Sequence, residues 1–529
     1  MSFDLIPEPQ SVTLKGDAAD SDDAGAPVPV ALPLVGRISE DRDIDDIAGV
    51  FPTQLADDIE AATGLRWDIA SDVMVAGLPA PNAAIAHPVP PHASCWKSFI
   101  TLRLDPPSLE PQEYRLTIAR SGIDVVGGDT EGVRNGVQTL RQIIRQCAPA
   151  LPRLVIADKP AYKVRGYYLD ATRGRVPTLD WLKTWADRLC LYKYNQLQLY
   201  IEHTFMFDDL SETWRGTSPL KPADIIAFDE YCARLGIELV PSVSTFGHQY
   251  MAMRTRELRH LGEFPEDADR QYGFVERQRH HTLNITEPES LAFSFKLIDA
   301  YMQLFRTRKF NICGDETFDL GRGRSKPEAE RRGVAAMYAD FVSQLCRHLS
   351  ERGRDPMFWG DIAVEMPQIL GLLPDNVTLL NWLYAPGIGE DKVRLVAQAG
   401  APQYVCSAVW CWNALLPRLD DSWNNISRLA RYGVKYGAVG YLVTDWGDYG
   451  HVNDPRMAVS GMIFGAQCAW NPMAHIQGEA GCGDGEEGSA AGYADAAADV
   501  VRENKAAADG DSPAPLPSSS ESDDYTDRK

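Results

Sequence analysis

Short apolar stretches alternate with longer amphipathic ones through the middle of this chain. The short stretches are rich in β-branched and aromatic residues, which is typical of buried strands. The longer stretches repeat apolar residues every three or four positions, as amphipathic helices do. Eight strands are predicted, at residues 164–170, 195–202, 237–243, 309–316, 356–361, 377–382, 403–410 and 438–446. Helices are expected between them, for example at 179–191, 222–235, 288–305 and 327–351.

Strand and helix alternate about eight times over residues 161–473, which is the arrangement of a (β/α)8 TIM barrel. A doubly wound open sheet would give a similar alternation. That fold usually has a glycine-rich phosphate loop after its first strand, and no such loop follows residues 164–170. The pattern therefore favours the barrel.

The pattern differs on both sides of this region. Residues 1–160 contain strand-like stretches at 114–119 and 122–128, followed by an amphipathic helix at 131–146, and together they predict a small α+β domain. Nothing in that domain suggests chemistry. Residues 474–529 are rich in Gly, Ala, Asp, Glu and Ser and contain few residues to bury, so they predict a disordered acidic tail.

Polar and aromatic residues stand at the predicted strand ends, where barrel enzymes build their active sites. They are Asp170, Glu202, His248, Asp315, Glu316, Asp361, Trp382, Asp445 and Trp446. The sharpest feature is the pair Asp315–Glu316. Side chains alternate along a strand, so one carboxylate could face a scissile bond while the other reaches a different substrate atom. A helix cap or a surface turn would produce the same pair of residues.

Several of these segments resemble glycoside hydrolase family 20, the β-N-acetylhexosaminidases. The family signature is roughly His-x-Gly-Gly-Asp-Glu, and residues 311–316 read NICGDE, with Asn311 and Cys313 as departures. Residues 165–173, RGYYLDATR, resemble the first barrel strand, which carries a sugar-binding arginine. Residues 197–205 and 240–249 resemble two further strands and supply Glu202 and His248. The N-terminal unit resembles the small domain that precedes the family's barrel.

The resemblance implies an exo-acting, retaining β-N-acetylhexosaminidase that removes terminal β-linked GlcNAc or GalNAc. In this family the substrate's own acetamido oxygen is the nucleophile, an exception to the usual two-carboxylate scheme. Glu316 is then the acid/base, and Asp315 orients the acetamido group. His248 and Glu202 are expected to pair behind Glu316, and Arg165 to hold sugar hydroxyls. No metal or organic cofactor is implied.

The resemblance also implies a pocket lined by Trp359, Trp382 and Trp446, with Asp448 as a hydroxyl ligand. The seventh strand departs most from the family, which has there a Tyr that binds the acetamido oxygen and then an Asp. This chain has Trp410 in that region, and Asn413 is the candidate for the Asp. Tyr384, which follows the sixth strand, is the candidate for the missing Tyr.

Composition narrows the partners and the location. The formal net charge of -22 argues against nucleic acid or an anionic membrane as the main partner, and no apolar run is long enough to cross a bilayer. The ten Cys form no CxxC pair, and no basic, apolar leader is evident at the N-terminus, which predicts reduced thiols in a cytoplasmic protein. The expected partner is a small oligosaccharide or glycoconjugate, and nothing indicates an oligomeric state.

Two other functions fit the same residues. The altered seventh strand would also suit a barrel that binds sugars with weak or no catalysis. An enzyme narrow for a GlcNAc-containing disaccharide or glycoconjugate would use the same catalytic pair.

Overall fold

The computed structural model describes residues 3–14, 28–70 and 98–474. The predicted acidic tail lies outside these ranges. None of the helices in them is long and apolar enough to cross a membrane.

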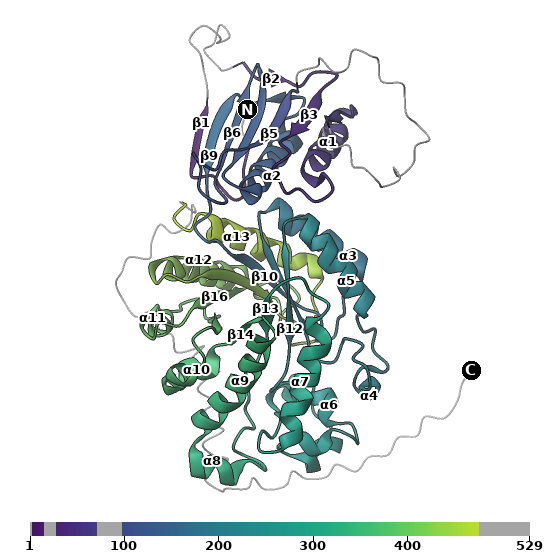
Figure 1. Cartoon of the computed structure of the whole chain (residues 1–529), viewed down its shortest axis with the longest axis vertical. Coiled ribbons are helices and arrows are strands. Elements are labelled where there is room, and N and C mark those ends of the chain that lie inside the picture. Colours follow the sequence, from purple (N-terminus) through teal and green to yellow (C-terminus); the bar gives the residue numbers. More distant parts are fainter. Residues whose placement is uncertain (1–2, 15–27, 71–97, 475–529) are drawn as a thin grey trace, which may run out of the picture. The chain divides into compact units, whose positions relative to one another are not determined.

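The N-terminal part forms a mixed sheet of seven strands with two long helices (Figure 1). In spatial order the strands are β1 (Ser11–Leu14), β9 (Leu154–Asp158), β6 (Tyr114–Ala119), β7 (Gly122–Gly127), β5 (Ile100–Leu104), β3 (Arg37–Glu40) and β4 (Asp68–Ala70). The helices are α1 (Val50–Thr63) and α2 (Thr130–Cys147), and the short strands β2 (Val30–Ala31) and β8 (Ala150–Leu151) pair separately. The predicted small α+β domain is confirmed.

Helix α2 matches the helix predicted at 131–146 and connects the sheet to the rest of the fold. It begins where the Asp129 side chain accepts a hydrogen bond from Gly132 N at 2.7 Å, an N-cap. It is buried on nearly all sides, because apolar residues such as Val133 pack in the core of the sheet while Arg134 donates to the carbonyls of Tyr194 and Leu235.

The second part is a closed parallel barrel of eight strands, so the open-sheet alternative is excluded. The strands are β10 (Arg165–Asp170), β11 (Gln196–Ile201), β12 (Glu238–Val243), β13 (Lys309–Asn311), β14 (Asp355–Trp359), β15 (Thr378–Trp382), β16 (Gln403–Ala408) and β17 (Gly440–Asp445). Strand β10 pairs with β17 and closes the ring. Each of the eight overlaps a predicted strand, although β13 ends at Asn311, five residues before the predicted end.

Helices cover the barrel between consecutive strands (Figure 1). They are α3 (Leu179–Leu191), α4 (Ser211–Trp214), α5 (Pro222–Arg234), α6 (Tyr250–Met253), α7 (Pro288–Met302), α8 (Lys326–Arg332), α9 (Val334–Glu351), α10 (Asp361–Glu365), α11 (Asp391–Gln398), α12 (Leu419–Lys435) and α13 (Val459–Trp470). The single helix predicted at 327–351 is two helices, because Gly333 between them has a φ of 83°.

The interior of the barrel is unusually aromatic. A buried cluster joins side chains from most of the strands, with Trp382, Tyr384 and Trp412 packed at its edge. Its aromatic members are Tyr168, Tyr200, Trp359, Tyr404 and Trp446. Tyr168 lies at its centre, with ring centroids 4.9 Å from Trp359 and 4.7 Å from Trp446. This packed layer supports the residues at the strand ends above it.

Candidate active site

The Asp315–Glu316 pair stands on a loop and not on the strand that was predicted to carry it. Strand β13 ends at Asn311, and the backbone then enters the left-handed region at Cys313, Gly314 and Glu316, with φ values of 60°, 83° and 47°. Strand alternation therefore does not orient the two carboxylates, and that part of the prediction was wrong. Strained backbone of this kind is concentrated at functional sites.

Asp361 holds the strained Glu316 backbone in place. Its Oδ2 accepts a hydrogen bond from Glu316 N at 3.1 Å. Burial raises the pKa of Asp361 well above its usual range, and the neighbouring Asp315 carboxylate raises it further. The sequence placed Asp361 at a strand end but assigned it no role.

His248 brings the two carboxylates together. Its Nε2 lies 3.5 Å from Asp315 Oδ2 and 3.5 Å from Glu316 Oε2, and its side chain is 1% exposed. The loop that carries it packs tightly on the catalytic loop, since a Cβ on Gly247 would lie 2.6 Å from the Asp315 carbonyl oxygen. His248 therefore contacts both members of the pair, as a residue that tunes an acid/base should.

Electrostatics favours Glu316 as the proton donor. Burial raises the pKa of Glu316 to about 7, helped by the charges of Asp315 and Asp448 and opposed by His248 and Arg173. Burial disfavours a charged His248, but Asp315 and Glu316 outweigh it and raise the pKa of His248 to about 9. At neutral pH the site thus holds an imidazolium beside a glutamic acid that is partly protonated.

These values predict a pH profile. Glu316 donates a proton only in its protonated form, so kcat/KM is expected to fall as the pH rises through about 7. The positive charge of His248 lowers the pKa of Glu316, so His248→Gln should move this alkaline limb to higher pH. The exposed His260→Gln, which loses only a surface pair with Glu289, should leave the limb in place. A limb that stays unchanged in His248→Gln would contradict the electrostatic role of His248.

The predicted sugar ligand Arg165 lies at the wrong end of the barrel. It is the first residue of β10 and is 1% exposed. Its guanidinium is 2.9 Å from Glu131 of α2 and donates to the carbonyls of Lys193 and Tyr162. Arg165 therefore joins the barrel to the N-terminal sheet domain, and its assignment to the substrate was wrong.

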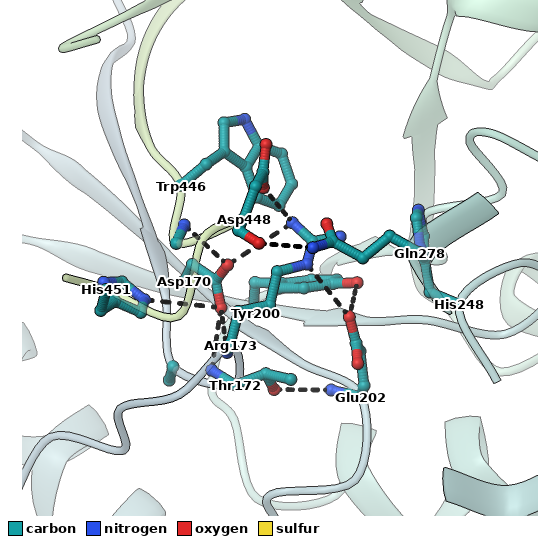
Figure 2. Close-up of polar contacts among 12 residues, drawn as sticks. Asp170, Thr172, Arg173, Tyr200, Glu202, His248, Gln278, Trp446, Asp448 and His451 are labelled. Atoms are coloured by element: carbon teal, nitrogen blue, oxygen red, sulfur yellow. Dashed lines mark hydrogen bonds and ion pairs between the residues drawn. The ribbon is translucent and has the colours of Figure 1, made fainter. Parts of the chain in front are cut away.

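Arg173 occupies the place expected for that arginine. It follows the carboxyl end of β10 and is 4% exposed. Figure 2 shows its guanidinium among three carboxylates: Asp448 at 2.9 Å, Glu202 at 3.4 Å and Asp170 at 3.5 Å. It also lies over the rings of Tyr200 and Trp446. The signal was present in the sequence, because Arg173 is the other arginine of RGYYLDATR and the one placed after the strand end.

Asp170 fixes the position of Arg173. It is fully buried and accepts hydrogen bonds from the backbone amides of Thr172, Arg173 and Gly447 (Figure 2). Burial opposes its charge, but His451 and Arg173 hold the pKa of Asp170 below its ordinary value. Asp170 therefore ties the loop after β10 to the loop after β17, where Asp448 stands.

Glu202 and His248, predicted to pair, line one cavity and interact through their charges, but no hydrogen bond or ion pair joins them in the described ranges. Its Oε1 accepts a hydrogen bond from the Tyr200 hydroxyl at 2.9 Å, and its ion pairs within the described ranges are with Arg173 and His203. Burial opposes its charge, but His203 and Arg173 hold the pKa of Glu202 below its usual range. Glu202 therefore helps to hold Arg173, while His248 faces the catalytic carboxylates.

Tyr384 lies at the edge of the aromatic cluster, beside Trp446. Its hydroxyl accepts a hydrogen bond from Trp446 Nε1 at 2.6 Å, and its ring stacks on Trp382 at 5.1 Å. Trp410 donates from Nε1 to the Tyr384 carbonyl at 2.9 Å, so Trp410 supports Tyr384. Burial raises the pKa of Tyr384, which keeps its hydroxyl protonated.

Two other predicted substrate ligands lie differently. Trp359 is fully buried, 5.6 Å from Trp446 between ring centroids, and supports that ring from within the barrel. Asn413 is exposed on the turn that follows Trp410, and this turn meets the loop of Asp448, since the Trp412 carbonyl accepts a hydrogen bond from Tyr449 N at 3.1 Å. Its role as the counterpart of the family's Asp stays a prediction.

A loop that the sequence did not single out, residues 272–282, joins three parts of the site. Gln278 donates from Nε2 to the Asp448 carbonyl at 2.5 Å (Figure 2). The His281 carbonyl accepts from Gln249 N at 3.0 Å, and His281 N donates to Asp319 at 2.9 Å. The loop therefore connects the segments that carry Asp448, His248 and Glu316.

Comparisons with known proteins agree with this fold. A family model described as the catalytic domain of glycosyl hydrolase family 20 matches residues 162–411, and domain 2 of the same family matches residues 43–159. The two ranges together cover more than half of the chain. They correspond to the barrel and to the sheet domain before it.

Curated relatives carry related names. A β-hexosaminidase of Akkermansia muciniphila is 30% identical over 342 residues, which are 58% of this chain and 65% of that protein. A lacto-N-biosidase of Bifidobacterium bifidum is 26% identical over 303 residues, 54% of this chain and 25% of that protein. This chain thus spans less than two thirds of the length of either relative.

Solved structures show the same fold. The crystal structure of a β-N-acetylhexosaminidase from Bacteroides fragilis superposes with a TM-score of 0.63 at 17% identity and covers 95% of both chains. At this identity the likeness concerns the fold.

Proposed function

Since this chain belongs to glycosyl hydrolase family 20, we propose that it is an exo-acting, retaining β-N-acetylhexosaminidase. The observation that carries this proposal is the contact of His248 with both Asp315 and Glu316, where Glu316 has a pKa of about 7. Arg173 and Asp448 form a second polar group at the same mouth of the barrel, suited to sugar hydroxyls.

The reaction uses the substrate's acetamido group as nucleophile. Its oxygen attacks the anomeric carbon and forms an oxazoline-type ring, while Glu316 gives its proton to the leaving oxygen. Asp315 accepts the acetamide N–H and offsets the positive charge that develops there. In the second step Glu316 takes a proton from water, which attacks the anomeric carbon and restores the acetamido group. Two inversions leave the configuration retained, and orientation supplies most of the advantage.

Tyr384 fits the role of the hydroxyl that binds the acetamido oxygen. Its oxygen accepts from Trp446 and also interacts with the Thr444 side chain, and the O–H can rotate to donate its proton to the substrate. A donor aimed at this oxygen both orients the nucleophile and stabilises charge on the ring intermediate. The tyrosine hydroxyl that the family places on the seventh strand would then come, in this chain, from Tyr384 after the sixth strand.

We expect Tyr384→Phe to lower kcat by about 10- to 100-fold while the fold is kept, since one oriented donor is lost. Binding of a thiazoline mimic of the oxazoline should weaken in parallel, because the same contact is made to it. The matched control is Tyr231→Phe, which removes a hydroxyl bonded to Asp187 on the outer helices. Unchanged turnover and thiazoline inhibition in Tyr384→Phe would remove Tyr384 from the site.

Hydrolysis of the p-nitrophenyl β-glycosides of GlcNAc and GalNAc tests the activity itself. Turnover that thiazoline blocks would support the substrate-assisted mechanism. If the folded protein turns over neither glycoside, a sugar-binding barrel or a narrow disaccharide substrate becomes the better account.

The loop at residues 272–282 supports release of single residues over release of disaccharides. It contacts the backbone of Asp448, next to Arg173, where the far hydroxyls of the sugar would be held. A second sugar on those hydroxyls would meet this loop. The test compares the nitrophenyl glycoside of GlcNAc with that of a disaccharide whose GlcNAc is substituted at O3. Release of the intact disaccharide would instead support the narrow disaccharide enzyme.

A cytoplasmic location is part of the proposal. It is supported by the eight cysteines in the described ranges, which are all free thiols and seven of which are buried. Detection of the protein in a cell fraction with an oxidising environment would contradict it.

A further inference from the structure

A cleft on the substrate side of the barrel is lined by four arginines and one acidic residue. Its lining residues are Glu212, Arg215, Met251, Arg254, Thr255, Arg256 and Arg259. They come from the loops after β11 and β12, at the carboxyl ends of the strands. We call this the arginine cleft, and its volume of about 500 Å³ is in the usual range for small-molecule sites.

The positive charge of the arginine cleft is only partly neutralised. Arg259 pairs with Asp269 at 2.9 Å, and Arg254 donates to the Tyr250 hydroxyl. Arg215 and Arg256 have no side-chain hydrogen bond or ion pair with any residue that the structure describes. Such a cluster stands out in a chain whose net charge is -22, and it creates a local field that attracts anions.

A second cleft of this protein also contains several arginines, but it differs from the arginine cleft in how their charges are paired. That cleft, of about 620 Å³, is also lined by arginines, but each has an acidic partner. Arg324 lies 3.5 Å from Glu287, Arg331 lies 2.5 Å from Glu328, and Arg332 pairs with Asp340. In the arginine cleft Arg256 acts on the charge of Asp269, which Arg259 already binds, so Arg215 and Arg256 keep donors for an anionic ligand.

The arginine cleft lies beside the active site. Met251 lines it and also lines a smaller cavity whose wall includes Glu202 and His248. Helix α6, which contributes Met251, begins two residues after His248. A molecule with its terminal sugar at Glu316 could therefore place a later part of its chain near these arginines.

We propose that the arginine cleft binds a sulfate or carboxylate group of an acidic glycan whose terminal residue occupies the active site. Guanidinium groups bind these planar or tetrahedral oxyanions with paired, charge-assisted hydrogen bonds. The inference rests on the proposed function, because it takes a glycan as the substrate. To the proposed function it adds a substrate preference: the enzyme should favour sulfated or uronate-containing glycans and act less well on neutral ones.

The test compares an oligosaccharide that has terminal β-GlcNAc and a sulfate on the next residue with its desulfated counterpart. We expect wild-type kcat/KM to be higher for the sulfated form. In the double variant Arg215→Gln/Arg256→Gln this preference should fall at least about tenfold, since two charged donors are lost. Raising the salt concentration should reduce the preference in the wild type. The matched control, Arg331→Gln/Arg332→Gln, should keep the preference.

Direct binding separates the two anionic groups. Wild-type protein should be retained at low salt on immobilised chondroitin sulfate, and retention on hyaluronan as well would show that carboxylates suffice. The inference would be overturned if both double variants lost the preference for the sulfated oligosaccharide equally. It would also be overturned if the wild type showed neither that preference nor retention on chondroitin sulfate. Turnover of nitrophenyl GlcNAc by the same preparations tests the proposed function separately, because neither pair of arginines belongs to the catalytic machinery.

Discussion

Glu316→Gln should reduce kcat by about 100- to 10,000-fold, the usual contribution of a positioned general acid/base. Glutamine keeps the shape of the side chain but has no proton to give. The loss should grow as the leaving group becomes poorer, because a nitrophenolate departs with little protonation whereas a sugar alkoxide needs it. A series of aryl glycosides and one oligosaccharide measures this dependence.

The control for that variant is Glu365→Gln. Glu365 is exposed at the end of α10 and contributes the least of the named charges that raise the pKa of Asp361, so its variant should change turnover far less than Glu316→Gln. Thermal unfolding of both variants shows whether the fold is kept. Wild-type turnover of the oligosaccharide by Glu316→Gln would mean that another group is the acid, and the proposed mechanism would fall.

Arg173→Lys should reduce kcat/KM by about 100-fold, the scale of a misplaced substrate contact. Lysine keeps the positive charge among Asp170, Glu202 and Asp448 but loses the planar fork that can bind two oxygens at once. The loss should appear for every substrate with the same terminal sugar, since the change lies away from the leaving group.

Arg165→Met should lower the stability of the fold and leave catalysis unchanged, the reverse of what we expect for Arg173→Lys. It removes one partner of Glu131 at the contact between sheet domain and barrel while Arg134 and Asn195 remain, and this should cost about 1–3 kcal/mol of unfolding free energy. The folded fraction should keep wild-type kcat/KM. Denaturant unfolding together with kinetics separates the two arginines, and Arg165→Lys offers a milder change if the Met variant does not fold. A catalytic defect in folded Arg165 variants would restore the original assignment.

Local patterning was sufficient to predict the barrel. Each strand is a short apolar run and each helix has one apolar face, and these periodicities are local properties of the sequence. The proposed catalytic pair came from the family resemblance, because Asp315 and Glu316 match the family signature after a buried strand, and its role stays a prediction. His248 and Trp446 were singled out at predicted strand ends, and Asp448 through the family resemblance alone.

The errors concern choices that depend on three dimensions. Arg165 and Arg173 belong to one motif eight residues apart, and only the direction of β10 decides which of them faces the substrate. Glu202 was assigned to His248, yet the path of the loop after β11 places it against Arg173. Neither outcome is encoded in the spacing of residues along the chain.

Hydrophobic periodicity is local, and it was enough to predict the fold class and the residue types at the strand ends. The acid/base role of Glu316 came from the family resemblance and stays a prediction. Only the tertiary structure decided which side chains meet. Gln278 and Asp448 lie 170 residues apart in the sequence, yet a hydrogen bond joins them. Arg215 and Arg256 likewise come from separate loops and line one cleft. The physical reason is that barrel closure brings the carboxyl ends of all strands to one mouth, where contacts depend on loop paths and packing and not on sequence distance.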